Sequence, residues 1–379
     1  MKVVIKNCNE YDSDLVKSKI KESLDELGGL PSLIKPNDKV FIKLNCLGPF
    51  NQDLGITTHP VVLKAVIELV KEITPNISLG DNPAVRDQIQ TMKKNGTYDV
   101  AVEENVRIID TKEFKKIYNP TYKLYSEFEV SKEMLDNDVI INLPKLKTHS
   151  LAYITAAEKN LFGFIYGLNK SAWHVKANNP SIFGQVINDL YGAIKENYKD
   201  KPFISICDGI IALEGEGPST GGKAKDAKVL LTSLDPVSLD RVAVEVMGLD
   251  FNKSYITKIA GERGYGETDL SKIEIVGDKL ENKHFLEPHN ALDNGKLAIL
   301  KFKPLRNALL EHPTIDHNKC IRCGECTRIC PPKTMVIEKG EYPHLKTLKC
   351  IRCWCCAEVC PQNAISKSKR PVLGKILLK

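Results

Sequence analysis

The stretch "CIRCGECTRICPP" occupies residues 320–332, and "CIRCWCCAEVCPQ" occupies residues 350–362, thirty residues further along the chain. Both stretches follow the spacing C-x2-C-x2-C-x3-C-P. They hold nine of the 12 cysteines of this 379-residue chain, and the other three are Cys8, Cys46 and Cys207. The C-terminal segment therefore has a chemistry of its own, and the repeat decides how that segment folds.

This spacing is typical of ligands to iron–sulfur cubes. Three thiolates at successive x2 gaps can hold three corners of a 4Fe-4S cluster, and the fourth cysteine reaches across to the other cluster. Zinc sites usually have two pairs of cysteines separated by a longer loop, and disulfides are rare in a reducing cytosol. We therefore expect two 4Fe-4S clusters. Their interlocked ligand sets are Cys320, Cys323, Cys326 and Cys360 for one, and Cys350, Cys353, Cys356 and Cys330 for the other.

A ninth cysteine, Cys355, lies beside Cys356 and makes either thiol a possible third ligand of the second set. We expect Cys356 to be the ligand and Cys355 to pack beside the cluster. The prolines after the fourth thiolates, Pro331 and Pro361, should end a short helix. Residues 313–367 resemble the bacterial two-cluster ferredoxins. That resemblance implies a small α+β module whose two clusters lie close enough to exchange single electrons.

The bulk composition limits the remaining possibilities. A chain of this length exceeds what one core usually supports, and 42% hydrophobic with 27% charged residues is ordinary globular composition. No stretch of apolar residues is long enough to span a membrane, and the apolar run at the N-terminus is too short for a signal peptide. We expect a cytoplasmic protein. The net charge of +6 without clustered Arg, Lys and aromatic residues argues against a nucleic-acid partner.

Strand-like apolar runs alternate with amphipathic helical stretches through the first three hundred residues. Strands are expected at residues 40–48, 77–82, 106–110, 138–149, 203–213 and 228–233. Thr58 is expected to cap a helix with Pro60 in its first turn, and Asp235 a helix that begins at Pro236. The alternation predicts an α/β domain with a largely parallel sheet at residues 1–303. A linker (304–312), the ferredoxin-like module (313–367) and a basic tail (368–379) follow, and the tail should fold back on its own domain.

Ligands of such sheets bind beyond the carboxyl ends of the strands, so polar residues there are site candidates. In "LPKLKTH", the residues Lys145, Lys147 and His149 alternate at the end of a predicted strand and should project to one side. Two ammonium groups and an imidazole would bind a carboxylate or phosphate and supply a proton. The alternative is a solvated, positively charged edge. Pro144 and the apolar run before it favour a functional loop, so we treat these three residues as catalytic candidates.

Five further residues are candidates for substrate binding. His59 precedes a helix whose free N–H groups favour anions, although it could equally be a capping residue. Lys159 and Asn160 lie in "AAEKNLFG", just before a small, flexible segment. Asp208 and Glu214 flank "GIIAL" and could orient a lysine or bind a metal, or serve as ordinary turn carboxylates.

Two glycine-rich stretches fail as nucleotide sites. Residues 217–224, "GPSTGGKA", nearly spell a phosphate loop, but Ala224 stands where the magnesium-binding hydroxyl belongs and a strand follows closely. Residues 261–267, "GERGYGE", do not match the dinucleotide fingerprint. The sequence shows no recognisable nicotinamide or flavin site. The sequence is compatible with an additional, unidentified cofactor in the α/β domain.

Several longer motifs resemble a prokaryotic family, the domain of unknown function family 362. They are "ITTHPVVLKAVIELV", "NLPKLKTH", "AAEKNLFG", "CDGIIALEGEGPSTGG" and "SLDPVSLDRVAVEVMG", spread over residues 36–248. Members of the family often carry a C-terminal ferredoxin module, but the resemblance implies no particular activity. The overall plan is also distantly similar to the N-terminal domain of lactate-racemase-type proteins, which hold a nickel cofactor.

Together these features predict an iron–sulfur oxidoreductase. It would pass single electrons from a low-potential donor protein through two 4Fe-4S clusters to an anionic small molecule or cofactor in the α/β domain. One alternative is a non-catalytic electron-transfer adaptor for a partner enzyme, donor or acceptor. Another is a metallocofactor or maturation protein, which would carry a metal beyond iron. The sequence indicates neither the substrate nor the direction of electron flow.

Overall fold

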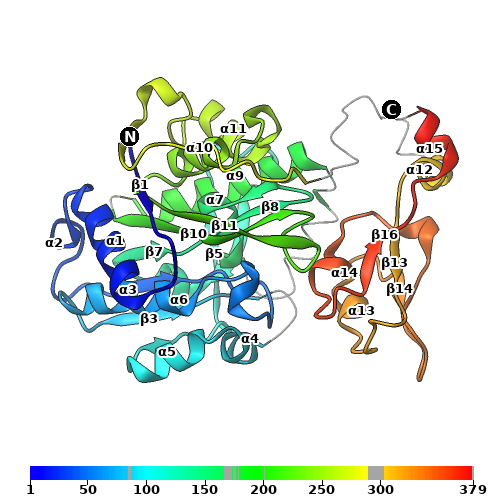
Figure 1. Ribbon diagram of the computed structural model, residues 1–379, viewed down its shortest axis with the longest axis horizontal. Coiled ribbons are helices and arrows are strands. Elements are labelled where there is room, and N and C mark those ends of the chain that lie inside the picture. Colours follow the sequence, from blue (N-terminus) through cyan, green and yellow to red (C-terminus); the bar gives the residue numbers. More distant parts are fainter. Residues whose placement is uncertain are drawn as a thin grey trace.

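The computed structural model describes residues 1–83, 87–165, 173, 176–177, 179–199, 201–288 and 303–377. A larger part contains a mostly parallel sheet with helices on both faces, and a smaller part with short strands lies beside it (Figure 1). This arrangement confirms the predicted fold class. Within the described residues, no helix combines the length and apolar character needed to cross a bilayer.

The large sheet runs in the order β12-β1-β11-β10-β7-β2-β3-β4, with β8 beside β10 and β9 beside β8. Pairings among β10, β7, β2, β3 and β4 are parallel, whereas β11 is antiparallel to both of its neighbours. The strands are β1 (Lys2–Asn7), β2 (Val40–Lys43), β3 (Ile77–Gly80), β4 (Arg107–Ile108), β7 (Val139–Asn142), β8 (Lys145–His149), β9 (Tyr153–Thr155), β10 (Phe203–Gly215), β11 (Gly222–Ser233) and β12 (Glu274–Gly277). A separate hairpin pairs β5 (Phe114–Tyr118) with β6 (Glu127–Ser131).

Helices cover both faces of this sheet, as burial of its central strands requires. Val40 and Ile42 pack with α1 (Ser13–Asp25) and α3 (Pro60–Lys71) on one face. Phe41 points the other way and packs on the opposite face. That face is covered by α9 (Pro180–Asn197), α10 (Pro236–Met247) and α11 (Tyr255–Glu262) (Figure 1). The other α-helices that the structure describes in this part are α2 (Leu30–Leu33), α4 (Gln88–Asn95), α5 (Thr97–Glu103), α6 (Lys132–Leu135) and α7 (Ala157–Asn160).

Two local predictions are wrong in detail. The α3 helix is capped by His59, whose ring accepts a hydrogen bond from the Val61 N–H, and not by Thr58. The Thr58 hydroxyl instead accepts from the Asn45 N–H at 2.9 Å and donates to the Leu143 carbonyl at 2.7 Å. The single strand expected at residues 138–149 is two strands, β7 and β8, because Pro144 interrupts the hydrogen-bonding pattern between them.

The smaller part is built from two short antiparallel pairs, β13 with β16 and β14 with β15. The expected linker and tail are both helical, and Gly374 approaches the Leu309 carbonyl so closely that no side chain would fit between them. The tail helix therefore packs on the helix formed by the expected linker. The elements are α12 (Lys303–Leu309), β13 (Pro313–Ile315), α13 (Glu325–Ile329), β14 (Met335–Val336), β15 (His344–Leu345), α14 (Cys355–Glu358), β16 (Ile365–Lys367) and α15 (Val372–Leu377).

The sequence repeat is also a backbone repeat. Arg322 and Arg352, thirty residues apart, have φ angles of 55° and 59°, and the next matched pair, Gly324 and Trp354, has 76° and 62°. One residue later a short helix begins in each half, α13 and α14. The two cysteine stretches therefore share the turn at 322–324 and 352–354 and the start of the helix that follows it.

Candidate functional site

The first predicted set of cluster ligands converges in the small part. Burial, followed by the charges of Cys323, Cys360 and Cys320, raises the pKa of the Cys326 thiol to about 12. A cavity of about 20 Å³ is lined by the same four cysteines. Thiolates held this closely repel one another unless cations lie between them. The donor set therefore fits the irons of a 4Fe-4S cluster.

The second predicted set shows the same electrostatics. The pKa of Cys356 is raised above its usual range by burial and then by Cys353, Cys350 and Cys330 among its neighbouring thiolates. The Arg352 N–H donates to Cys350 Sγ at 3.4 Å, the kind of bond that stabilises a thiolate ligand. This arrangement fits a second cluster whose fourth ligand comes from the other half.

The backbone repeat bears on the surplus cysteine. Cys356 is equivalent to Cys326, whereas Cys355 is equivalent to Glu325, the first residue of α13. Cys355 is buried and, unlike Cys356, lines a cavity that faces the sheet. This geometry favours Cys356 as the third ligand.

That cavity, of about 100 Å³, lies where the sheet meets the small part. Its floor and walls come from residues that follow β2 and β3, from β8 and from α7, at the carboxyl ends of the parallel strands. Its remaining wall is formed by α13 and α14. The lining residues are Asn45, Cys46, Leu47, Asp81, Asn82, Pro83, Lys147, His149, Thr155, Lys159, Asn160, Phe162, Gly163, Pro218, Ile329, Cys355, Glu358 and Val359.

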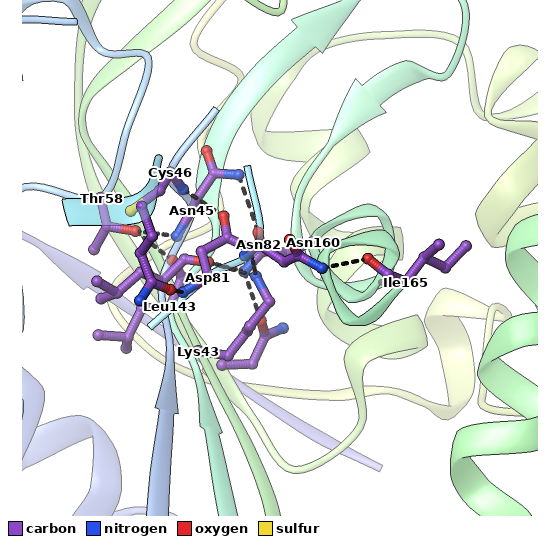
Figure 2. A network of polar contacts seen from close by, with 12 residues as sticks. Lys43, Asn45, Cys46, Thr58, Asp81, Asn82, Leu143, Asn160 and Ile165 are labelled. Carbon is purple, nitrogen blue, oxygen red and sulfur yellow. Dashed lines mark hydrogen bonds and ion pairs between the residues drawn. The ribbon is translucent and has the colours of Figure 1, made fainter. Parts of the chain in front are cut away.

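A buried ion pair anchors the floor of the cavity. Lys43 Nζ lies 2.6 Å from Asp81 Oδ1 and 2.6 Å from the Leu44 carbonyl (Figure 2). The other carboxylate oxygen of Asp81 accepts from the Cys46 N–H at 2.6 Å, and Oδ1 also accepts from the Asn82 N–H at 2.7 Å. A buried charge is tolerated when it is paired and hydrogen-bonded in this way. The pair fixes the loops after β2 and β3.

An asparagine network beside it positions one of the predicted catalytic lysines. Asn142 accepts from Asn160 Nδ2 at 2.8 Å, and Asn160 Oδ1 accepts from Asn45 Nδ2 at 3.0 Å (Figure 2 shows the Asn45–Asn160 bond). The orientation of Asn45 then directs its Oδ1 to Lys147 Nζ at 2.7 Å. The Ile56 carbonyl is the second acceptor of Lys147, at 2.8 Å. Both acceptors are neutral, so the network holds the ammonium group without compensating its charge.

Two lysines form a cationic wall. Burial lowers the pKa of Lys147 to about 7, and repulsion from Lys159 and Lys145 contributes. Burial also lowers the pKa of Lys159 to about 8, while Glu358 opposes this shift. Lys159 Nζ lies over the Phe162 ring, 4.6 Å from its centroid. Within the described ranges, Lys159 has no hydrogen-bond acceptor and no ion-pair partner at contact distance, so its charge is available to a ligand.

His149 faces the same space from the end of β8. Its Nδ1 accepts hydrogen bonds from the backbone N–H groups of Leu151 at 3.0 Å and Ala152 at 3.2 Å. The neutral ring must therefore carry its proton on Nε2, which lies 4.0 Å from Glu358 Oε1 of α14. His149 is thus a hydrogen-bond donor toward the cavity and the wall formed by α14.

The third residue of the predicted trio has another role. Lys145 Nζ lies 2.7 Å from Asp208 and 2.7 Å from the Tyr11 hydroxyl, and neither Lys145 nor Asp208 lines the cavity. Asp208 also accepts from the His59 N–H at 3.2 Å, and the His59 ring stacks on Tyr11 with centroids 3.5 Å apart. Burial lowers the pKa of His59 to about 4, so the ring is neutral. These residues form a closed, charge-balanced cluster beside the site.

Glu214, the last of the predicted candidates, lies near the far end of β10. It pairs with Lys225 at 3.1 Å and accepts from the Leu286 N–H at 3.0 Å. The structure therefore brings Lys147, His149, Lys159 and Asn160 together. It places Lys145, His59, Asp208 and Glu214 elsewhere.

Several cavity residues were missed by the sequence reasoning. Asn45 and Asp81 directly follow apolar strands, which is the signal that singled out Lys147, so they could have been found. Glu358 and Cys355 gave no such signal, because their position depends on how the small part packs against the sheet.

Comparison with known proteins gives the family. The profile of a domain of unknown function, DUF362, matches residues 40–245, and that of a 4Fe-4S dicluster domain matches residues 312–361. The thylakoid-associated protein sll1697 of Synechocystis sp. is 32% identical over 241 residues, which cover 63% of this chain and 72% of that protein.

Two solved structures are similar at a much lower level. A protein from Thermotoga maritima has 14% identity and a TM-score of 0.40, covering 65% of this chain and 59% of its own. The lactate racemase apoprotein from Thermoanaerobacterium thermosaccharolyticum has 12% identity and a TM-score of 0.37, with 62% and 55% covered. The chain thus spans less than two thirds of either structure. The family and the module rest on the profiles: the chain belongs to the DUF362 family and carries a C-terminal 4Fe-4S dicluster module, whose chemistry is electron transfer.

Proposed function

We propose that this protein is an iron–sulfur reductase that delivers single electrons to an anionic substrate held between the α/β domain (1–303) and the module (313–367). One observation carries the proposal. The cavity that holds Lys147 and Lys159 is closed on its other side by α14, the helix that contains Cys356 and begins two residues after Cys353. A substrate in the cavity would therefore lie next to the second predicted cluster.

The charges of the cavity support an anion as the substrate. Lys159 has no acceptor of its own among the described residues, and the acceptors of Lys147 are neutral. His149 adds an Nε2–H donor. A cavity of about 100 Å³ holds the volume of about three water molecules, enough for a carboxylate or a group of similar size. An anion there would complete the electrostatics of the site.

The same residues are suited to proton transfer. General acids work best when their pKa lies near the working pH, and Lys147 and Lys159 have pKa values of about 7 and 8. His149 is held as the Nε2–H tautomer by two backbone donors, so it orients the substrate and leaves proton donation to the lysines. The clusters, when bound, supply one electron each. A two-electron reduction would then take up two protons, one from each lysine. The lysines would regain their protons from water.

The proposed partner is a low-potential electron donor protein, and the proposed location is the cytoplasm. Dithionite can stand in for the donor in vitro. A non-catalytic adaptor would need no polar cavity between its clusters and the sheet. The enclosed site with its uncompensated lysines favours the reductase.

Reoxidation kinetics test this function. The anaerobic holoprotein is reduced with dithionite and mixed with small anionic acceptors such as sulfite, nitrite and fumarate, while cluster absorbance is recorded. We expect at least one acceptor to speed reoxidation, and Lys159→Met to slow that reaction by about tenfold or more. The matched control is Lys116→Met, an exposed lysine on β5 whose side chain is 59% accessible. If no acceptor speeds reoxidation, or Lys159→Met behaves like the control, the reductase proposal is wrong.

A further inference from the structure

A larger groove lies beside the cavity and shares two lining residues with it. The groove has a volume of about 460 Å³, within the range of small-molecule sites. Pro218 and Glu358 line both the groove and the cavity, so the two spaces meet at these residues. One wall is formed by the loop after β10, from Glu216 to Gly221. The other wall belongs to the module and includes Trp354, Ala357 and Ile365. The groove and the cavity are therefore neighbours, separated at most by these two side chains.

The two halves of the module differ where the second half faces the groove. Trp354 replaces the equivalent Gly324, and Glu358 replaces Arg328, which is exposed and paired with Glu325 in the first half. Ala357 likewise stands where the first half has a threonine. The spacing of the predicted ligand cysteines and the left-handed turn before the helix are the same in both halves. The differences are therefore not needed to hold clusters, and they coincide with the groove.

Trp354 is the most informative of these differences. Its φ of 62° lies in the left-handed region, which a bulky residue rarely adopts and which suits the glycine of the first half. A residue kept in a disfavoured conformation is often kept for its function. The indole lies beside the groove with Lys367 Nζ 5.8 Å from its centroid, and Trp354 directly follows Cys353. It offers a flat apolar surface next to the second cluster.

The charges at the rim indicate what kind of molecule fits. Glu216 pairs with Lys367 at 2.6 Å, and Glu311 pairs with Arg370 at 2.8 Å. The groove thus presents balanced ion pairs around an apolar wall, in contrast to the uncompensated lysines of the inner cavity. A polyanion would gain little here, whereas an aromatic or conjugated body would stack on the indole.

We infer that the groove binds the flat apolar body of a molecule whose anionic head enters the cavity, and that Trp354 is the residue that selects for this body. The inference rests on the proposed function for the position of the head group only. It assigns the substrate class as an aromatic or conjugated acid, larger than the cavity alone would admit.

Calorimetric binding of three carboxylates to the anaerobic holoprotein tests this inference: acetate as a bare head group, octanoate with a flexible body and 4-phenylbutanoate with an aromatic one. We expect 4-phenylbutanoate to bind about tenfold tighter than acetate and tighter than octanoate. Trp354→Gly, which installs the residue of the first half, should reduce this preference to about threefold or less and leave acetate binding unchanged. Leu348→Gly is the control, because Leu348 is an exposed apolar residue of the module that does not line the groove.

The outcomes separate this inference from the function on which it rests. Equal affinities for the three probes, or a preference that survives Trp354→Gly, would overturn the groove assignment. Lys159→Met should weaken the binding of acetate and the binding of 4-phenylbutanoate by the same factor. If it weakens both while no aromatic preference exists, the groove assignment alone fails. If the preference exists but Lys159→Met changes neither affinity, the groove assignment stands and the anion site fails. Iron content and cluster absorbance confirm that each variant is assembled.

Discussion

Two lysines of the same strand show how differently a buried charge can be used. Lys145 and Lys147 lie two residues apart on β8, and both are almost inaccessible to solvent. Lys145 lies 2.7 Å from the carboxylate of Asp208, whereas Lys147 has only the neutral oxygens of Asn45 and Ile56 as acceptors. The first arrangement is complete without a ligand. The second leaves a charge that a bound anion would compensate.

This contrast explains which predicted residues form the site. Burial of a charge is costly, and a structural role provides an opposite charge to offset that cost. The Lys43–Asp81 pair follows the rule at 2.6 Å, as does Lys145–Asp208. Lys147, whose acceptors are neutral, departs from it and lines the cavity that faces the module. The half-buried Lys159 lines the same cavity without an ion-pair partner at contact distance among the described residues, although the charge of Glu358 acts on it. A buried cation without a carboxylate partner is therefore a better indicator of function here than a lysine motif in the sequence.

The largest expected effect comes from breaking the compensated pair. Lys145→Met leaves the Asp208 carboxylate buried without its cation, which should lower the free energy of unfolding by about 3–5 kcal/mol. Lys147→Met removes an uncompensated charge and two hydrogen bonds, so it should cost no more than about 2 kcal/mol. Urea denaturation of both variants, followed by circular dichroism, compares them directly. Equal losses would erase the distinction between the two lysines.

Much of this comparison was beyond the reach of the sequence. The strands were predictable because their apolar runs are local, and the 4Fe-4S dicluster module because its cysteine spacing is typical of cluster ligands. Asp208 is 63 residues from Lys145, so the motif "LPKLKTH" could not show which of its lysines is paired. Glu358 is 199 residues beyond Lys159, so only the packing of the module against the sheet brings it to the cavity.

The pH dependence of anion binding should sharpen the comparison at the cavity. The pKa values of Lys147 and Lys159 are lowered to about 7 and 8, so both lysines are charged in mild acid and lose their protons as the pH rises through these values. An anion prefers the charged forms. Acetate should therefore bind the holoprotein roughly tenfold or more weakly at about pH 9 than at about pH 6.

Calorimetry at several pH values measures this dependence, with ionic strength held constant. Lys147→Met should keep the step contributed by Lys159, near pH 8, and the step of Glu358, whose pKa burial raises to about 7 and whose negative charge also disfavours an anion. Lys145→Met would be a poor control because it destabilises the fold, so the exposed Lys116→Met variant serves instead. Acetate affinity that stays flat across this range in the unmodified protein would contradict uncompensated lysines at the cavity.

The smallest expected effect concerns the neighbouring thiols Cys355 and Cys356, which extend the comparison to anionic groups. Cys356 is equivalent to Cys326 and is expected to be a thiolate compensated by iron, whereas Cys355 is equivalent to Glu325 and lines the cavity. Cys355→Ala should keep about eight irons per chain, the content of two 4Fe-4S clusters, and Cys356→Ala should keep only about four. Iron analysis of the anaerobic proteins measures both values. Loss of iron from Cys355→Ala and not from Cys356→Ala would exchange the two roles, and would place a ligand thiolate on the wall that faces the lysines.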